Sequence, residues 1–164
     1  MTAPPIPPTN TLNLTADNSI VAVYSDGLAV SSGSLPNANN PGAVDTVVLP
    51  NITTFIAVEA NDAGDGEFGI LASDSLGFIL TNTSWKCSGV SAPGWNAPGF
   101  DDSFWPYAVE APGNCFDLPE IAASATWIWS SPYYSTVYCR LNICKIVLFN
   151  IQEETRPPEV FFPL

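Results

Sequence analysis

The stretch SIVAVYSDGLAVSSG, residues 19–33, decides the fold class. A run of β-branched and aromatic residues ends at an Asp26-Gly27 step, and a second apolar run follows it. Asp-Gly is typical of the two-residue turns of β-hairpins, because both turn positions need a positive φ that these residues tolerate. The stretch therefore predicts two antiparallel strands joined by a tight turn.

Short apolar runs separated by turn residues continue along the chain, and none has the spacing of an amphipathic helix. In residues 53–62, Ile56, Val58 and Ala60 alternate with other residues and are expected on one buried face. About nine or ten short strands predict an all-β protein, an antiparallel β-sandwich or jelly roll. Besides 19–33, strands are predicted within 11–16, 43–50, 53–62, 68–87 (two strands around Ser75-Leu76-Gly77), 125–130, 136–143 and 145–151.

The length of 164 residues suits one domain with its own core. We expect a Pro-rich N-terminal arm in residues 1–10, the β-sandwich domain in 11–151 and an extended C-terminal tail in 152–164. The tail has adjacent prolines and an apolar end. It either covers the domain's own sheet, which is the preferred interpretation, or adds to a neighbouring molecule.

The chain is acidic, with 16 Asp and Glu against four Lys and Arg and a formal net charge of −12. This field repels phosphates and anionic lipids, and no apolar run reaches the ~20 residues of a membrane helix, so nucleic acid and membranes are not expected partners. Histidine is absent, which removes the commonest general base and zinc ligand. Glycoside hydrolysis needs only two carboxylates, but the sequence places no pair in a cleft, and we expect no enzymatic activity.

The four cysteines lie in the second half of the chain without a CxxC spacing. An even number in a weakly charged chain predicts two disulfides and an oxidising compartment, with buried free thiols as the alternative. If residues 138–143 form one extended strand, Cys139 and Cys144 lie ~16 Å apart, too far to pair with each other. The preferred pairing joins Cys87 to Cys139 and Cys115 to Cys144, and the other crossed pairing stays open.

The chain opens MTAPPIPPTNT, without the basic start and apolar segment of a secretory signal. We interpret Met1 as a start or processing remnant on a mature, secreted chain. Sequons at Asn13, Asn51 and Asn82 fit an extracellular glycoprotein. Because Leu12 and Leu14 flank Asn13, a strand that buries the leucines is expected to point the Asn13 amide to solvent.

Five segments of the chain occur in the order of a known family: LTADNSIVAVYSDGLAV, TTFIAVEANDAGDGEFGILAS, ILTNTSWKCS, GWNAPGFDDSFWPYAVE, and ATWIWS with VYCR, within residues 12–143. Together they resemble the galactose-binding-domain-like β-sandwich modules that accompany the catalytic domains of large glycoside hydrolases, including α-L-rhamnosidases and β-galactosidases. Such modules are commonly non-catalytic, and they bind sugars or brace a neighbouring domain. The resemblance therefore implies a binding or assembly role.

Residues 81–107, TNTSWKCSGVSAPGWNAPGFDDSFWPY, are called the Trp segment below. The resemblance implies that Trp85, Trp95 and Trp105 fasten this crossing segment onto the sandwich, each burying an indole whose N–H meets a loop carbonyl. The alternative is that one of them is an exposed ligand platform. Asp101 and Asp102 are expected to cap the following turn or to accept loop N–H groups.

A secreted, lectin-like glycan-binding module is the first functional hypothesis. Sugars present an apolar face and a rim of hydroxyls, so their sites need an exposed aromatic ring beside Asp, Asn or Glu acceptors. The loops expected outside the core offer Asn61, Asp62, Tyr133 and Tyr134. A surface loop without a ligand is the simpler alternative for each of them.

The loop NDAGDGE, residues 61–67, also carries hard oxygen ligands in Asp62, Asp65 and Glu67. Such oxygens suit a structural calcium ion, although the spacing is not that of an EF-hand and an ordinary acidic turn is the simpler interpretation. No other cofactor is expected.

The alternative function is a structural subunit of an extracellular filament, sheath or adhesive layer. The Pro-rich arm and the apolar tail would then join neighbouring copies into a homopolymer by strand addition.

Overall fold

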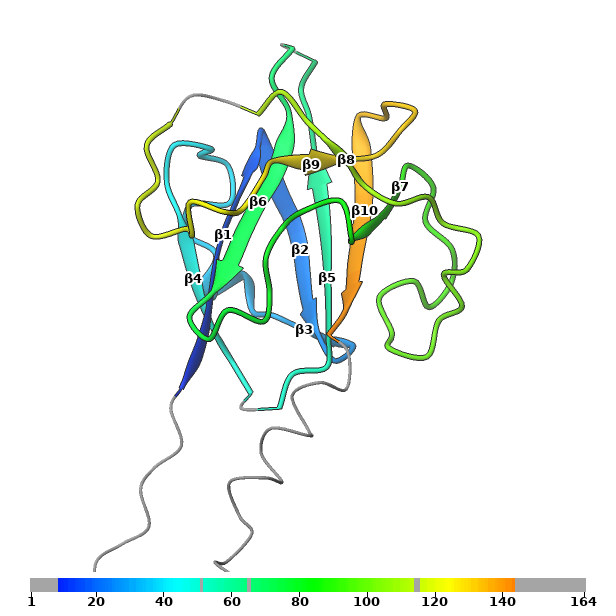
Figure 1. Ribbon diagram of the computed structural model, residues 1–164, viewed down its shortest axis with the longest axis horizontal. Helices are drawn as coiled ribbons and strands as arrows, with labels where there is room; N and C mark the ends of the chain where they lie inside the picture. The colour runs from blue at the N-terminus through cyan, green and yellow to red at the C-terminus, as the bar shows by residue number, and fades with distance from the viewer. Residues whose placement is uncertain (1–8, 51, 65, 114–115, 144–164) are drawn as a thin grey trace, which may run out of the picture.

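The computed structural model describes residues 9–50, 52–64, 66–113 and 116–143, and these form two antiparallel five-stranded sheets packed as a sandwich (Figure 1). The predicted all-β sandwich is therefore confirmed. The first sheet has the order β4-β1-β6-β9-β8, with β1 (Asn10–Asp17), β4 (Asp45–Leu49), β6 (Gly69–Asp74), β8 (Val109–Glu110) and β9 (Ile128–Trp129). The second has the order β3-β2-β5-β10-β7, with β2 (Ser19–Ser25), β3 (Leu28–Ala29), β5 (Phe55–Asn61), β7 (Lys86–Ser88) and β10 (Thr136–Asn142). No α-helix occurs in these ranges, and so none that could cross a membrane.

Alternating side chains of the two sheets build the core between them. Ile56, Val58 and Ala60 of β5 are fully buried there, as predicted, together with Leu12 and Leu14 of β1. The strands are short and contribute few core positions each: both residues of β3 and of β8 are exposed, and β7 buries only Cys87. Both sheets are therefore needed to exclude water from the core.

The hairpin at Asp26-Gly27 forms as predicted. Asp26 has a φ of 49° and Gly27 a φ of 81°, the left-handed values that a two-residue hairpin turn requires. Its second strand, β3, is shorter than predicted because a 3₁₀ turn (Ser32–Ser34) follows it. The Ser31 hydroxyl accepts a hydrogen bond from the Gly33 N–H, a local bond that competes with continued strand pairing.

Of the two strands predicted within residues 68–87, β6 forms as the first. The second is reduced to an isolated bridge between Ser73 and Leu80 and to Lys86 and Cys87 of β7. The Asp74 carboxylate accepts the Ile79 N–H at 2.8 Å, and the Thr81 hydroxyl bonds both the N–H and the carbonyl of Ala72. These side chains hold the returning chain locally, so it leaves the sheet instead of extending a ladder.

Two short strands lie where the sequence pattern was weak. β8 was not predicted, and β9 occupies only Ile128–Trp129 of the run predicted at 125–130. The strand predicted at 145–151, the tail at 152–164 and nearly all of the arm at 1–10 lie outside the described residues, whereas β1 begins at Asn10.

A disulfide joins Cys87 of β7 to Cys139 of β10, which confirms one of the two predicted bridges. The two residues are direct partners in the register of these antiparallel strands, and their Cα atoms are 4.1 Å apart. Strand β7 has only three residues, and the bridge secures it to the second sheet. Cys115 and Cys144 lie outside the described residues, so their pairing stays a prediction.

Candidate functional site

The part of the Trp segment that follows β7 lies beside β7 and β10 (Figure 1), and its Trp95, Phe100 and Trp105 pack on the outer face of the second sheet. Trp95 is only 8% exposed, and its indole meets Tyr24 of β2 and Tyr138 of β10 edge-on, with ring centroids 5.6 and 5.0 Å apart. Trp105 stacks on Trp95 at 6.4 Å. Trp85 is fully buried in the main core, where its indole N–H donates to the Leu80 carbonyl at 2.9 Å. Trp85 and Trp95 thus fasten the segment by burial, and the expected bond from an indole N–H to a loop carbonyl is found at Trp85. Trp105 is half-buried against Trp95.

Arg140 of β10 is the centre of this attachment. Its side chain is buried, and its guanidinium donates to the backbone carbonyls of Trp95 at 2.6 Å and Ala97 at 3.3 Å. The group also lies over the rings of Phe55 and Phe100, 4.6 and 5.0 Å from their centroids. One cation therefore binds the sheet and the covering segment together, using the planar donor fork that Lys lacks.

Asp102 supplies the counter-charge for Arg140. One carboxylate oxygen lies 2.8 Å from Arg140 Nε, and the other lies 3.2 Å from Lys86 Nζ. Burial lowers the pKa of Arg140, and the Asp102 charge opposes that shift. Asp101 is exposed, accepts the Ser103 N–H at 3.0 Å and has its pKa lowered by that hydrogen bond. Sequence reasoning found the turn contact of Asp101 but not the ion pairs of Asp102.

A different arrangement surrounds residues 131–135, called the Tyr loop below. The side chain of Tyr133 is 47% exposed, and its hydroxyl donates to the carboxylate of Asp62. Its ring lies 5.0 Å from that of Phe68, which in turn lies 5.7 Å from the buried Trp129. A row of rings thus runs from the core to the surface and ends at Tyr133.

Asp62 orients this loop from the end of β5. Its N–H donates to the Ser135 carbonyl at 2.8 Å, and its side chain accepts the Gly64 N–H at 3.0 Å as well as the Tyr133 hydroxyl. Asn61, the last residue of β5, is exposed next to it. The structure therefore brings together two of the four predicted ligand residues, Asp62 and Tyr133, whereas Asn61 is joined to them only as the chain neighbour of Asp62.

Tyr134, the fourth predicted ligand residue, is 40% exposed and packs toward the Trp segment. Its backbone carbonyl accepts the Trp129 indole N–H at 2.9 Å. Its ring lies directly over Gly89, where an added Cβ would be 1.9 Å from the ring carbon Cγ. Gly89 is therefore the position at which the two regions touch.

Phe68 and Gly89 were missed by sequence reasoning. Both lie far from residues 131–135 in the sequence and reach them only through the fold. Of the two, only Gly89 could have been found from the sequence. It directly follows residues 85–88, WKCS, and a glycine at such a place often marks a site where another part of the chain or a ligand comes close.

The calcium prediction stays untested. Both carboxylate oxygens of Asp62 already accept hydrogen bonds, Glu67 is exposed, and Asp65 lies outside the described residues. Among the residues that the structure does describe, no group of three His, Cys, Asp or Glu side chains is arranged to hold a metal.

The predicted glycosylation sites differ in their surroundings. The amide nitrogen of Asn13 donates to the Glu120 carbonyl at 2.7 Å, and its oxygen accepts the Thr46 hydroxyl at 2.8 Å, so this side chain is held against the sheet rather than pointing freely to solvent. The Asn82 side chain accepts the Ser84 N–H in a turn. Asn51 lies outside the described residues.

The chain is 33% identical to an alpha-L-rhamnosidase of Streptomyces avermitilis over 115 aligned positions, which cover 62% of this chain and 11% of the relative. The chain thus spans about a tenth of that protein's length. No protein-family model and no solved structure matches it. The comparison establishes a weak, partial similarity to a region of a glycosidase, in a chain whose fold is a β-sandwich.

Proposed function

We propose that the protein is a secreted, non-catalytic glycan-binding module of the galactose-binding-domain-like type, with its site centred on Tyr133. The observation that carries the proposal is the fixed, half-exposed ring of Tyr133, hydrogen-bonded to Asp62 and backed by Phe68. A ring held in this way loses little conformational freedom when a sugar stacks on it. Exposed Asn61 supplies an amide for sugar hydroxyls at the same end of the sandwich.

The similarity to part of an alpha-L-rhamnosidase supports this proposal, because accessory regions of carbohydrate-active proteins commonly bind or position glycans. The Cys87–Cys139 disulfide supports the secreted location, since such bonds persist in oxidising compartments.

The test is a glycan array on the purified chain, followed by calorimetric titration of the strongest ligand. Tyr133→Ala is expected to weaken binding ~10-fold or more, because the stacking ring carries the contact. Phe104→Ala is the matched control: Phe104 is 92% exposed but lies in the Trp segment, so its loss should leave affinity unchanged. Absence of any glycan ligand, or equal losses in both variants, would overturn the proposal.

A further inference from the structure

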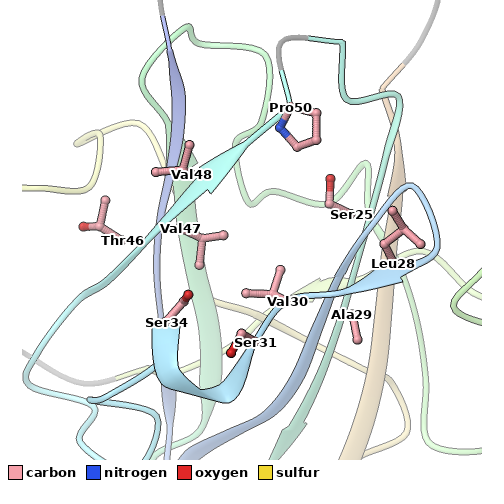
Figure 2. Close-up of a pocket in the computed structure, with 10 residues that line it drawn as sticks. All are labelled: Ser25, Leu28, Ala29, Val30, Ser31, Ser34, Thr46, Val47, Val48 and Pro50. Atoms are coloured by element: carbon pink, nitrogen blue, oxygen red, sulfur yellow. The ribbon is translucent and has the colours of Figure 1, made fainter.

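An apolar groove of about 370 Å³ lies at one open side of the sandwich, between the edge strands of the two sheets (Figure 2). β4 forms one wall, and β3 with the turn after it forms the other. Figure 2 shows Val47 and Val30 facing each other across it. The lining residues are Ser25, Leu28, Ala29, Val30, Ser31, Ser34, Thr46, Val47, Val48 and Pro50.

The chemistry of the groove suits a polypeptide rather than a charged or sugar-like ligand. No charged and no aromatic side chain lines it. Leu28 is 74% exposed at its rim, an apolar side chain without cover from the described residues. Moreover, β4 pairs with β1 on one side and with no described strand on the other, so backbone groups of an edge face the groove side.

The described chain ends close to this groove. The N–H of Ile143 donates to the Thr54 carbonyl at 2.8 Å. The N–H and hydroxyl of Thr54 donate in turn to the Asp26 carboxylate at 2.9 and 2.8 Å. Asp26 follows Ser25, which lines the groove beside Pro50 at the end of β4. The chain therefore leaves the described domain at the Leu49 end of β4.

The chain beyond Ile143 has the length and composition to fill the groove. Residues 144–164 are 21 residues, which span ~70 Å when extended, whereas β4 has only five residues. Residues 145–151, KIVLFNI, combine β-branched, aliphatic and aromatic side chains on both alternating faces. Starting at the Leu49 end, this run would pass β4 in the antiparallel direction.

We propose that residues 145–151 add to β4 as an antiparallel strand in the groove of the same molecule. A tethered segment has an effective concentration in the millimolar range, far above that of a second copy in dilute solution. The net charge of −12 on each chain also opposes the approach of a second copy. The added strand covers the open edge and does not depend on the proposed glycan site.

Limited proteolysis of the full chain with trypsin tests this arrangement. Trypsin cuts after Lys and Arg, and the chain has only Lys86, Arg140, Lys145 and Arg156. Arg156 precedes Pro157, which blocks cleavage, and Arg140 is buried, so a cut after Arg140 reports global unfolding. The bond after Lys145 is expected to be protected in the wild-type protein.

Leu28→Asp places a charge at the rim of the groove and is expected to speed cleavage after Lys145 ~10-fold, because the open form becomes more populated. Val90→Asp is the control, since Val90 is 64% exposed and lies outside the groove. Ala29→Asp replaces Leu28→Asp if that variant is cut early after Arg140. The chain is measured by light scattering in parallel.

The expected result is a monomer with slow cleavage after Lys145 in the wild type and control and fast cleavage in the groove variant. Equal rates in the wild type and the groove variant overturn the proposal. So does protection that exists only in a dimer or polymer and disappears on dilution, because the groove is then occupied by a second copy.

Discussion

The Trp segment and the Tyr loop are both rich in aromatic residues, yet the structure uses their rings in opposite ways. In the Trp segment, Trp85 and Trp95 are buried and Arg140 binds the segment's own backbone carbonyls. In the Tyr loop, Tyr133 and Tyr134 keep close to half of their surface exposed while their backbone or hydroxyl groups are fixed. The Trp segment holds six aromatic residues and the Tyr loop two, and the two regions differ in how far the protein covers these rings.

This difference shows that aromatic density alone does not mark a binding site. In this protein the outer face of the second sheet carries Phe55, Ala57 and Tyr138, and a long connection that buries rings against them stabilises the fold. At Tyr133 the hydroxyl is bound by Asp62 while the side chain stays 47% exposed, so the ring is fixed and accessible at once.

Arg140→Gln is expected to detach the Trp segment from the second sheet and to have the largest effect on stability. Removing the guanidinium takes the buried ion-pair partner from Asp102, which keeps Lys86, and takes the donor from the Trp95 and Ala97 carbonyls. This is expected to lower the free energy of unfolding by ~3 kcal/mol or more. The loss of stability is measured by urea denaturation with Trp fluorescence as the readout. Lys86→Gln is the control, because its ion pair with the same Asp102 is partly exposed and worth ~1 kcal/mol or less. Equal losses in both variants would contradict the central role of Arg140.

Gly89→Ala should disturb the contact between the two regions. The new methyl would lie within 2 Å of Tyr134, so the ring must move, at an expected cost of ~1–3 kcal/mol. NMR chemical shifts of the Tyr134 ring measure the displacement. Gly99→Ala serves as the control, since a Cβ there meets nothing within 4 Å. Unchanged Tyr134 shifts in Gly89→Ala would show that the ring does not rest on Gly89.

Tyr133→Phe removes only the hydroxyl and separates its contribution to stability from that of the ring. The Asp62 carboxylate loses one of its hydrogen bonds, which is expected to cost ~1 kcal/mol of stability while the ring and its packing on Phe68 remain. Thermal denaturation measures the loss. A stability loss as large as that of Arg140→Gln would place the Tyr loop among the elements that hold the fold together.

Glu59→Gln is expected to have the smallest effect on stability, and this effect is expected to depend on pH. Burial on the second sheet raises the pKa of the Glu59 carboxyl. A carboxyl whose folded-state pKa is raised favours folding most below its unfolded pKa of ~4.3, and that contribution is lost as the pH rises through the folded-state pKa. Glu59→Gln is therefore expected to be slightly more stable than the wild type at pH 7, with no gain at pH 3. Glu110→Gln, on exposed β8, controls for the loss of one negative charge. A gain that is the same at pH 3 and pH 7 would exclude this cause.

Sequence patterns predicted the elements whose information is local. The Asp26-Gly27 hairpin and the alternation of Ile56, Val58 and Ala60 follow from turn geometry and a period of two, and both are found in the structure. The Cys87–Cys139 bridge belongs to the preferred pairing that was left after distance excluded a bond between Cys139 and Cys144. The second strand expected within residues 68–87 is not extended, because the Asp74 carboxylate accepts the Ile79 N–H and the Thr81 hydroxyl bonds Ala72 of β6. No apolar pattern records these side-chain contacts.

The sequence by itself determined an all-β chain of short strands, strongly acidic, with tryptophans suited to fastening a long connection. Only the tertiary structure decided which aromatic rings are covered and which remain accessible. Arg140 meets the Trp segment about 40 residues away from it in sequence, and Tyr133 meets Asp62 at a separation of 71 residues. Such contacts depend on how two sheets stack, and because stacking is a property of many strands together, no local run of residues encodes it.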